Sequence, residues 1–121
     1  MKVISAESAS QWPLYKKVMR LLDTEDALRA QAEEMGIHLT PYWPSVREGR
    51  VAMLALDVDG QRSTVELESF GSKAHRPFVF QHYGRYNQPP PAVCVKLLNE
   101  WLDRVFTEER TERGDMSRRN W

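Results

Sequence analysis

The sequence predicts an α+β fold in which a small three-stranded antiparallel sheet carries two helices on one face. Two β-type runs flank an Asp-Gly pair, a third run follows, and apolar stripes with helical spacing lie on both sides of these strands. The predicted element order is therefore α-β-β-β-α. At 121 residues the chain suits a single domain, which we expect over residues 1–106, followed by a polar C-terminal tail over residues 107–121.

The first helix is predicted between residues 10 and 36. Ser10 is a candidate N-cap, and Pro13 lies near the first turn, where its missing N–H costs nothing. An apolar stripe with helical spacing then continues to Gly36, a natural left-handed C-cap. Thr24, followed by two acids, could instead cap a second helix. One bent helix and two short helices both remain open at this stage.

A hairpin is predicted from residues 50–57 and 62–69, after a connector at residues 40–44 that contains two prolines. The turn lies at Asp59 and Gly60, because a type I′ turn needs positive φ at both central positions. This turn fixes the register of the two strands, and it pairs Asp57 with Arg62, Leu54 with Val65, and Ala52 with Leu67.

The register also assigns side chains to the two faces of the sheet. The face expected to pack on the helices contains Ala52, Leu54, Leu56, Val65 and Leu67. The opposite face contains Thr64, Glu66 and Glu68 together with an apolar row of Val51, Met53 and Ala55. Such a row indicates either a sheet face covered within the chain or a subunit interface, and a homodimer through the outer sheet face is one expectation.

The third strand is predicted over residues 76–83, with Pro77 near its start, where a missing donor is tolerated. Phe78 and Phe80 alternate with Val79, so we expect at least one aromatic pair of this strand to lie in the core. After a proline run, helical spacing resumes and predicts the last helix. Its apolar face consists of Cys94, Leu97, Leu98, Trp101, Leu102, Val105 and Phe106.

Composition excludes several classes of function. The lone cysteine, Cys94, leaves no disulfide and no cysteine-based zinc ribbon, and it is typical of a cytoplasmic protein. The longest apolar run is far too short to span a bilayer. The three histidines lack the spacing of metal ligands, and the six glycines stand singly, not in a phosphate-binding loop. We therefore expect no enzyme, no catalytic residue, no metal and no cofactor.

Residues 69–99 form a segment without acids in a chain of zero net charge. The whole chain has 17 basic and 17 acidic residues, whereas this segment has four basic residues and no acid. Basic side chains between aromatic ones can contact phosphates and stack on unpaired bases. The candidate nucleic-acid-binding residues are Lys73, His75, Arg76, His82, Tyr83, Arg85 and Tyr86.

A protein partner is the favoured alternative. Tyr42 and Trp43 lie between two prolines, and residues of these types most often anchor protein interfaces. The same two side chains would also serve to close over the end of the core. Because a neutral chain exerts no long-range attraction on DNA or RNA, the sequence favours a small accessory or regulatory protein that binds another protein. An adaptor or inhibitor in a nucleic-acid-processing complex fits this description, and direct nucleic-acid binding through residues 69–99 is the second hypothesis.

Overall fold

The predicted hairpin forms the centre of the fold. In a computed structural model that describes residues 6–68 and 77–112, strand β2 (Val51–Val58) pairs with β3 (Gln61–Glu68). The observed pairs include Asp57 with Arg62, Leu54 with Val65, and Ala52 with Leu67, so the predicted register is confirmed. Asp59 and Gly60 have φ values of 54° and 86°, as a type I′ turn requires.

The sheet has four antiparallel strands in the order β1-β2-β3-β4, so the prediction of three strands is wrong in number. The predicted third strand is β4 (Phe78–Tyr83), which pairs with β3. The additional strand is β1 (Met19–Leu21), whose Arg20 pairs with Ala55 on β2. The α+β class is retained, with a larger sheet.

The N-terminal region does not form the helix predicted over residues 10–36. It contains α1 (Ala6–Ser10), a run of turns, β1 and then α2 (Glu25–Met35). Ser10 is the last residue of α1 and not the N-cap of a longer helix, and turns connect it to β1. The predicted alternative of a separate helix capped by Thr24 is confirmed for α2. The Thr24 side chain accepts a hydrogen bond from the Ala27 N–H, and Gly36 is the left-handed C-cap.

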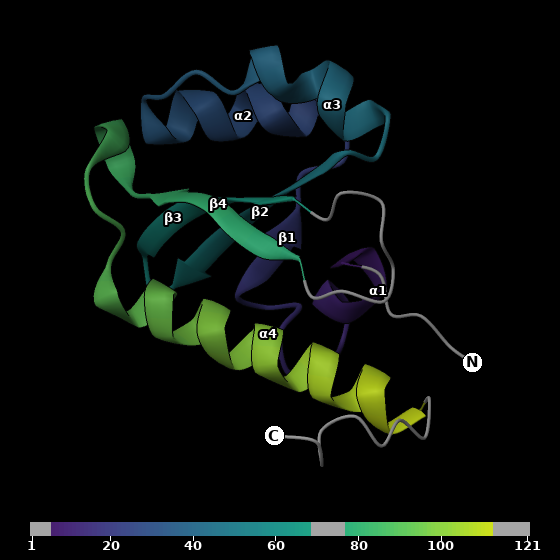
Figure 1. The fold of residues 1–121 in the computed structure, drawn as a ribbon. Helices are drawn as coiled ribbons and strands as arrows, with labels where there is room; N and C mark the ends of the chain where they lie inside the picture. The colour runs from purple at the N-terminus through teal and green to yellow at the C-terminus, as the bar shows by residue number, and fades with distance from the viewer. Residues whose placement is uncertain (1–5, 69–76, 113–121) are drawn as a thin grey trace.

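Helices cover both faces of the sheet, which corrects the prediction of two helices on one face. In Figure 1, α2 and α3 (Trp43–Arg47) lie above the sheet and α4 (Ala92–Glu112) lies below it. Alternation along β2 explains this arrangement, because both sets of side chains on that strand are apolar and both need cover. The lower core, between the sheet and α4, contains Leu54, Leu56, Val65 and Leu67 with Leu98 and Trp101 of α4. The upper core, between the sheet and α2, contains Met53 and Ala55 with Leu28 and Met35 of α2.

Two further differences concern the ends of helices. The expected connector at residues 40–44 is helical, with η1 (Thr40–Tyr42) running into α3, because each proline occupies one of the first two positions of its helix. The last helix begins at the predicted place and continues to Glu112, six residues beyond the expected domain boundary at 106. Residues 113–121 lie outside the described residues.

Candidate functional site

The outer edge of β4 is the candidate functional site. β4 borders β3 on one side, and no other strand in the described part of the chain borders its second side. An edge strand presents a row of peptide N–H and C=O groups that can pair with another chain. Natural edge strands commonly carry lysine or another charge that prevents such pairing, whereas the sequence of β4, Phe-Val-Phe-Gln-His-Tyr, has no Asp, Glu, Lys or Arg.

A β-bulge interrupts the ladder between β3 and β4. Leu67 pairs with Val79 and Glu66 pairs with Gln81, so Phe80 is an extra residue on β4. A bulge of this kind bends the strand and changes the direction of the side chains that follow. It also explains why strict alternation does not describe this strand.

The two phenylalanines of β4 are largely in solvent. Phe78 is 46% exposed and Phe80 is 54% exposed. Val79 packs into the core below the sheet and Tyr83 into the core above it. The expectation that an aromatic pair of this strand lies in the core is therefore wrong for Phe78 and Phe80, each of which exposes about half of its surface on the edge strand.

Tyr42 and Trp43 lie over the upper core. Tyr42 is the last residue of η1 and Trp43 is the first of α3, and both are half-buried against the cluster that contains Met53. The Tyr42 hydroxyl donates a hydrogen bond to the carboxylate of Glu66, and burial raises the pKa of Tyr42 above its usual value of 10.0. Tyr42 and Trp43 thus cover the end of the upper core, which is the alternative role that the sequence indicated for them.

Glu66 is the acid at the centre of this upper face. It is only 3% exposed, and its Oε1 has no hydrogen-bond partner among the residues that the structure describes. Burial raises the pKa of Glu66, and the neighbouring Glu68 carboxylate raises it further, while the Tyr42 hydroxyl acts in the opposite direction. Tyr83 borders the same acid, and burial raises its pKa to about 12. The face predicted to be the outer, acidic face of the sheet is thus an interior.

His82 belongs to a small polar cluster below the sheet. Its Nε2 shares a hydrogen bond of 2.8 Å with the Ser63 hydroxyl, and the Cys94 thiol donates to the Gln61 carbonyl oxygen at 3.3 Å. Ser63 and Cys94 are completely buried, so no substrate reaches either nucleophile in this conformation. Burial lowers the pKa of His82 to about 4, so its imidazole is neutral at pH 7. The cluster holds β3, β4 and α4 together.

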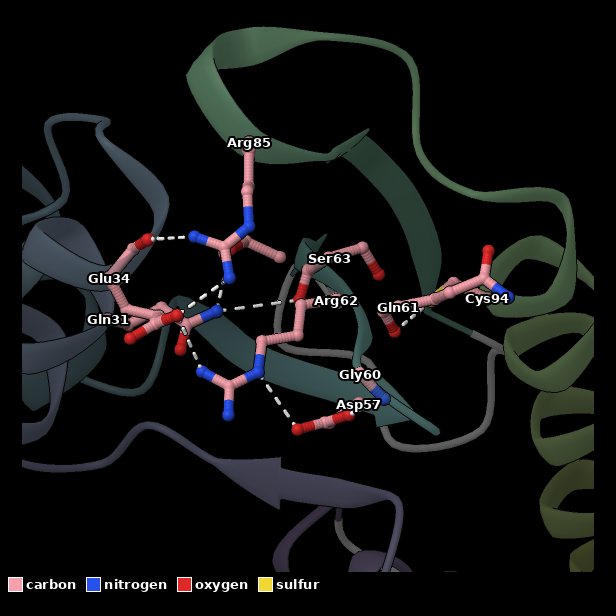
Figure 2. A network of polar contacts seen from close by, with 10 residues as sticks. Gln31, Glu34, Asp57, Gly60, Gln61, Arg62, Ser63, Arg85 and Cys94 are labelled. Atoms are coloured by element: carbon pink, nitrogen blue, oxygen red, sulfur yellow. Dashed lines mark hydrogen bonds and ion pairs between the residues drawn. The ribbon is translucent and has the colours of Figure 1, made fainter.

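Arg85 and Tyr86 attach the segment after β4 to the end of α2. Arg85, in η2 (Arg85–Asn87), donates to the backbone oxygen of Glu34 and, at 2.7 Å, to its carboxylate, as Figure 2 shows. The Glu34 carboxylate also forms an ion pair with the Arg62 guanidinium at 2.9 Å. These contacts lower the pKa of Glu34, with the Arg85 hydrogen bond as the largest cause.

The Tyr86 ring lies directly against Gly36. A Cβ atom added to Gly36 would come within 2.4 Å of the Tyr86 ring, so only glycine fits there without a shift. Tyr86 nevertheless keeps 69% of its surface in solvent. Arg85 and Tyr86 therefore have structural partners within the chain, and the sequence offered no sign that they would dock on α2.

The remaining candidates, Lys73, His75 and Arg76, lie outside the described residues. Among the candidates that the structure does describe, Tyr42 and Tyr83 come together above the sheet, where both border Glu66, whereas His82 lies below it. Sequence reasoning missed Phe78 and Phe80 as surface residues, although Pro77 beside them is a signal for an edge strand.

Two types of site are absent from residues 6–68 and 77–112. No group of three or more His, Cys, Asp or Glu side chains there could hold a metal ion. None of the helices formed by these residues has the length and apolar character needed to cross a membrane. Comparison of the chain with protein-family models, with curated proteins and with solved structures found no match.

Proposed function

We propose that this chain is a non-enzymatic binding protein that recognises a protein partner at the outer edge of β4. The observation that carries the proposal is the exposure of Phe80, at 54%, on an uncharged edge strand. An exposed aromatic side chain beside an open sheet edge combines apolar area with main-chain hydrogen bonds, which are the two components of strand addition. An adaptor or an inhibitor would both act in this way.

The chemistry of the edge defines the partner. An extended segment that pairs with β4 would gain its affinity from peptide hydrogen bonds and its specificity from apolar side chains that meet Phe78 and Phe80. Because β4 contains no Asp, Glu, Lys or Arg, charge contributes little to this contact. The complex should therefore depend only weakly on salt.

Direct nucleic-acid binding through residues 69–99 is the weaker proposal. Arg85 is engaged by Glu34, and His82 is neutral at pH 7. Two of the expected phosphate contacts are thus unavailable without local rearrangement. Tyr83 is half-buried in the upper core, so it offers little surface on which a base could stack.

The test compares three forms of the immobilised chain for capture of proteins from cells. The forms are the wild type, the variant Phe78→Ser with Phe80→Ser, and the control Val95→Ser, which alters a 38% exposed residue on α4. We expect a partner that the wild type and the control retain and the β4 variant loses. Hydrogen exchange of the purified complex should then show slower exchange at the β4 amides than in the chain alone.

Two results would contradict the proposal. The first is a captured partner that the β4 variant retains as well as the wild type does. The second is saturable binding of a labelled single-stranded or double-stranded oligonucleotide that weakens steeply as salt rises from low to physiological concentration. The second result would establish the nucleic-acid alternative.

A further inference from the structure

A second site, independent of the β4 edge, lies at the opposite edge of the sheet, beside β1. A cavity of about 210 Å³ opens beside β1, next to the hairpin end of β2 and β3. Its walls include four cationic side chains, Lys16, Lys17, Arg20 and Arg62, and one acid, Asp57. Gln31 of α2 also borders it. The cavity thus has a positive lining in a chain whose net charge is zero.

Three of the four cations have no acidic partner in the described part of the chain. Arg62 is neutralised, because Asp57 and Glu34 each contact its guanidinium at 2.9 Å. Lys16, Lys17 and Arg20 form no ion pair with any described residue. Three like charges around one cavity repel one another, and an anion placed between them would relieve that repulsion.

The backbone that carries these cations is fixed. The Lys16 N–H donates to the Trp12 carbonyl oxygen at 3.0 Å, and the completely buried Tyr15 anchors the same turn. Arg20 is held in the ladder opposite Ala55 on β2. The cationic residues therefore start from defined positions, which reduces the ordering cost of binding an anion.

Arg62 contributes a donor in a fixed direction. Its Nε and Nη1 atoms are held by Asp57 and Glu34, and Figure 2 shows its remaining guanidinium nitrogen, with no dashed contact, pointing toward β1. A guanidinium has five N–H donors in a planar fork, so donors remain for a ligand after these two contacts. The two carboxylates act here as supports that orient Arg62.

We infer that this cavity binds a small molecule that carries phosphate groups. A phosphate group has the charge and the several acceptor oxygens needed by two ammonium groups and one unpaired guanidinium, whereas a single carboxylate would satisfy only part of them. The cavity volume of about 210 Å³ limits the enclosed part of the ligand to a small group such as a phosphate or pyrophosphate.

The experiment is isothermal titration calorimetry at low salt with pyrophosphate and with adenosine triphosphate as probes. The variant Lys16→Ala with Arg20→Ala removes two of the unpaired cations, and Lys96→Ala removes an exposed cation on α4 far along the chain as a matched control. We expect one bound probe per chain, an affinity loss of at least tenfold in the double variant, and no change in the control. Circular dichroism confirms that each variant is folded.

Three outcomes would overturn the inference. Absence of binding to either probe at low salt excludes the site. Equal weakening by Lys96→Ala would show attraction to the general surface charge instead of this cavity. An oligonucleotide that binds more tightly than both probes, and that loses affinity in the double variant, would assign these cations to a nucleic-acid backbone.

Discussion

At the scale of the residue, the buried carboxyl group of Glu66 makes the stability of the protein depend on pH. Burial raises its pKa above the ordinary value of 4.5, so the folded state holds the proton more tightly than the unfolded chain does. The stabilisation from this proton is fully present below the unfolded-state pKa. It is lost as pH rises through the higher pKa of the folded state. Ionisation of this carboxylate therefore reduces stability.

Replacing this acid by its amide should stabilise the protein. In Glu66→Gln the side-chain oxygen can still accept from Tyr42, and the new NH2 group can donate to the Glu68 carboxylate. We expect the free energy of unfolding at pH 7 to rise by about 1 kcal/mol, which is within the range for relieving a buried polar group without a partner. Urea denaturation of both forms at pH 4 and pH 7 measures the effect.

The gain should be smaller at pH 4, because the wild-type carboxyl is more protonated there than at pH 7 and its raised pKa favours the neutral form. A gain of the same size at both values would show that the ionisation of Glu66 has no part in it. Tyr42→Phe provides the control, because it removes the hydroxyl that donates to the carboxylate, and it should lower the stability of the wild type.

At the scale of the element, the end of α2 depends on a close contact with η2. Gly36 has a φ of 67°, a backbone conformation that is unfavourable for residues other than glycine. The Tyr86 ring also occupies the space that a Cβ would need. Arg85 holds the same two elements together through Glu34. The turn after β4 is therefore positioned by the C-terminus of a helix far away in the sequence.

A double-mutant cycle can separate the two costs at this contact. Gly36→Ala should lower the free energy of unfolding by roughly 1–2 kcal/mol from backbone conformation alone, with an additional loss from displacement of the Tyr86 ring. In a Tyr86→Ala background only the backbone cost should remain. Equal losses in both backgrounds, measured by chemical denaturation, would mean that the ring yields without cost.

The elements differ in how far local sequence determines them. The hairpin was predictable because Asp59 and Gly60 specify the turn and the turn specifies the register. The strand β1 was not, because three residues carry no periodic signal and its formation depends on pairing with β2. The exposed face of β4 was missed for a similar reason, since the bulge at Phe80 arises from the fit of two strands.

At the scale of the whole molecule, one sheet separates two cores. Met53 points into the core under α2, and the adjacent Leu54 points into the core over α4. Helix periodicity predicted the apolar face of α4, but no local signal indicates which face of the sheet a helix will cover. The cavity beside β1 has the same limitation, because it joins residues from the N-terminal turns, α2 and the hairpin.

Because the two cores share their central strands, they should unfold together. Leu28→Ala, in the upper core, should lower stability by about 2–5 kcal/mol. Cys94 lies in the lower core and is the chain's one cysteine, so thiol labelling during urea titration reports that core separately from circular dichroism. We expect the variant to shift both transitions to the same lower urea concentration. A shift in circular dichroism without a shift in labelling would indicate independent unfolding.

The unequal edges of the sheet limit the stoichiometry of any complex formed by strand addition. β4 offers six residues without a formal charge, whereas β1 offers three residues and includes Arg20. A sheet with two usable edges can propagate into an open fibre, but a sheet with one usable edge is monovalent. Each chain would accept one added strand and then stop, so the assembly ends at a 1:1 complex and does not polymerise.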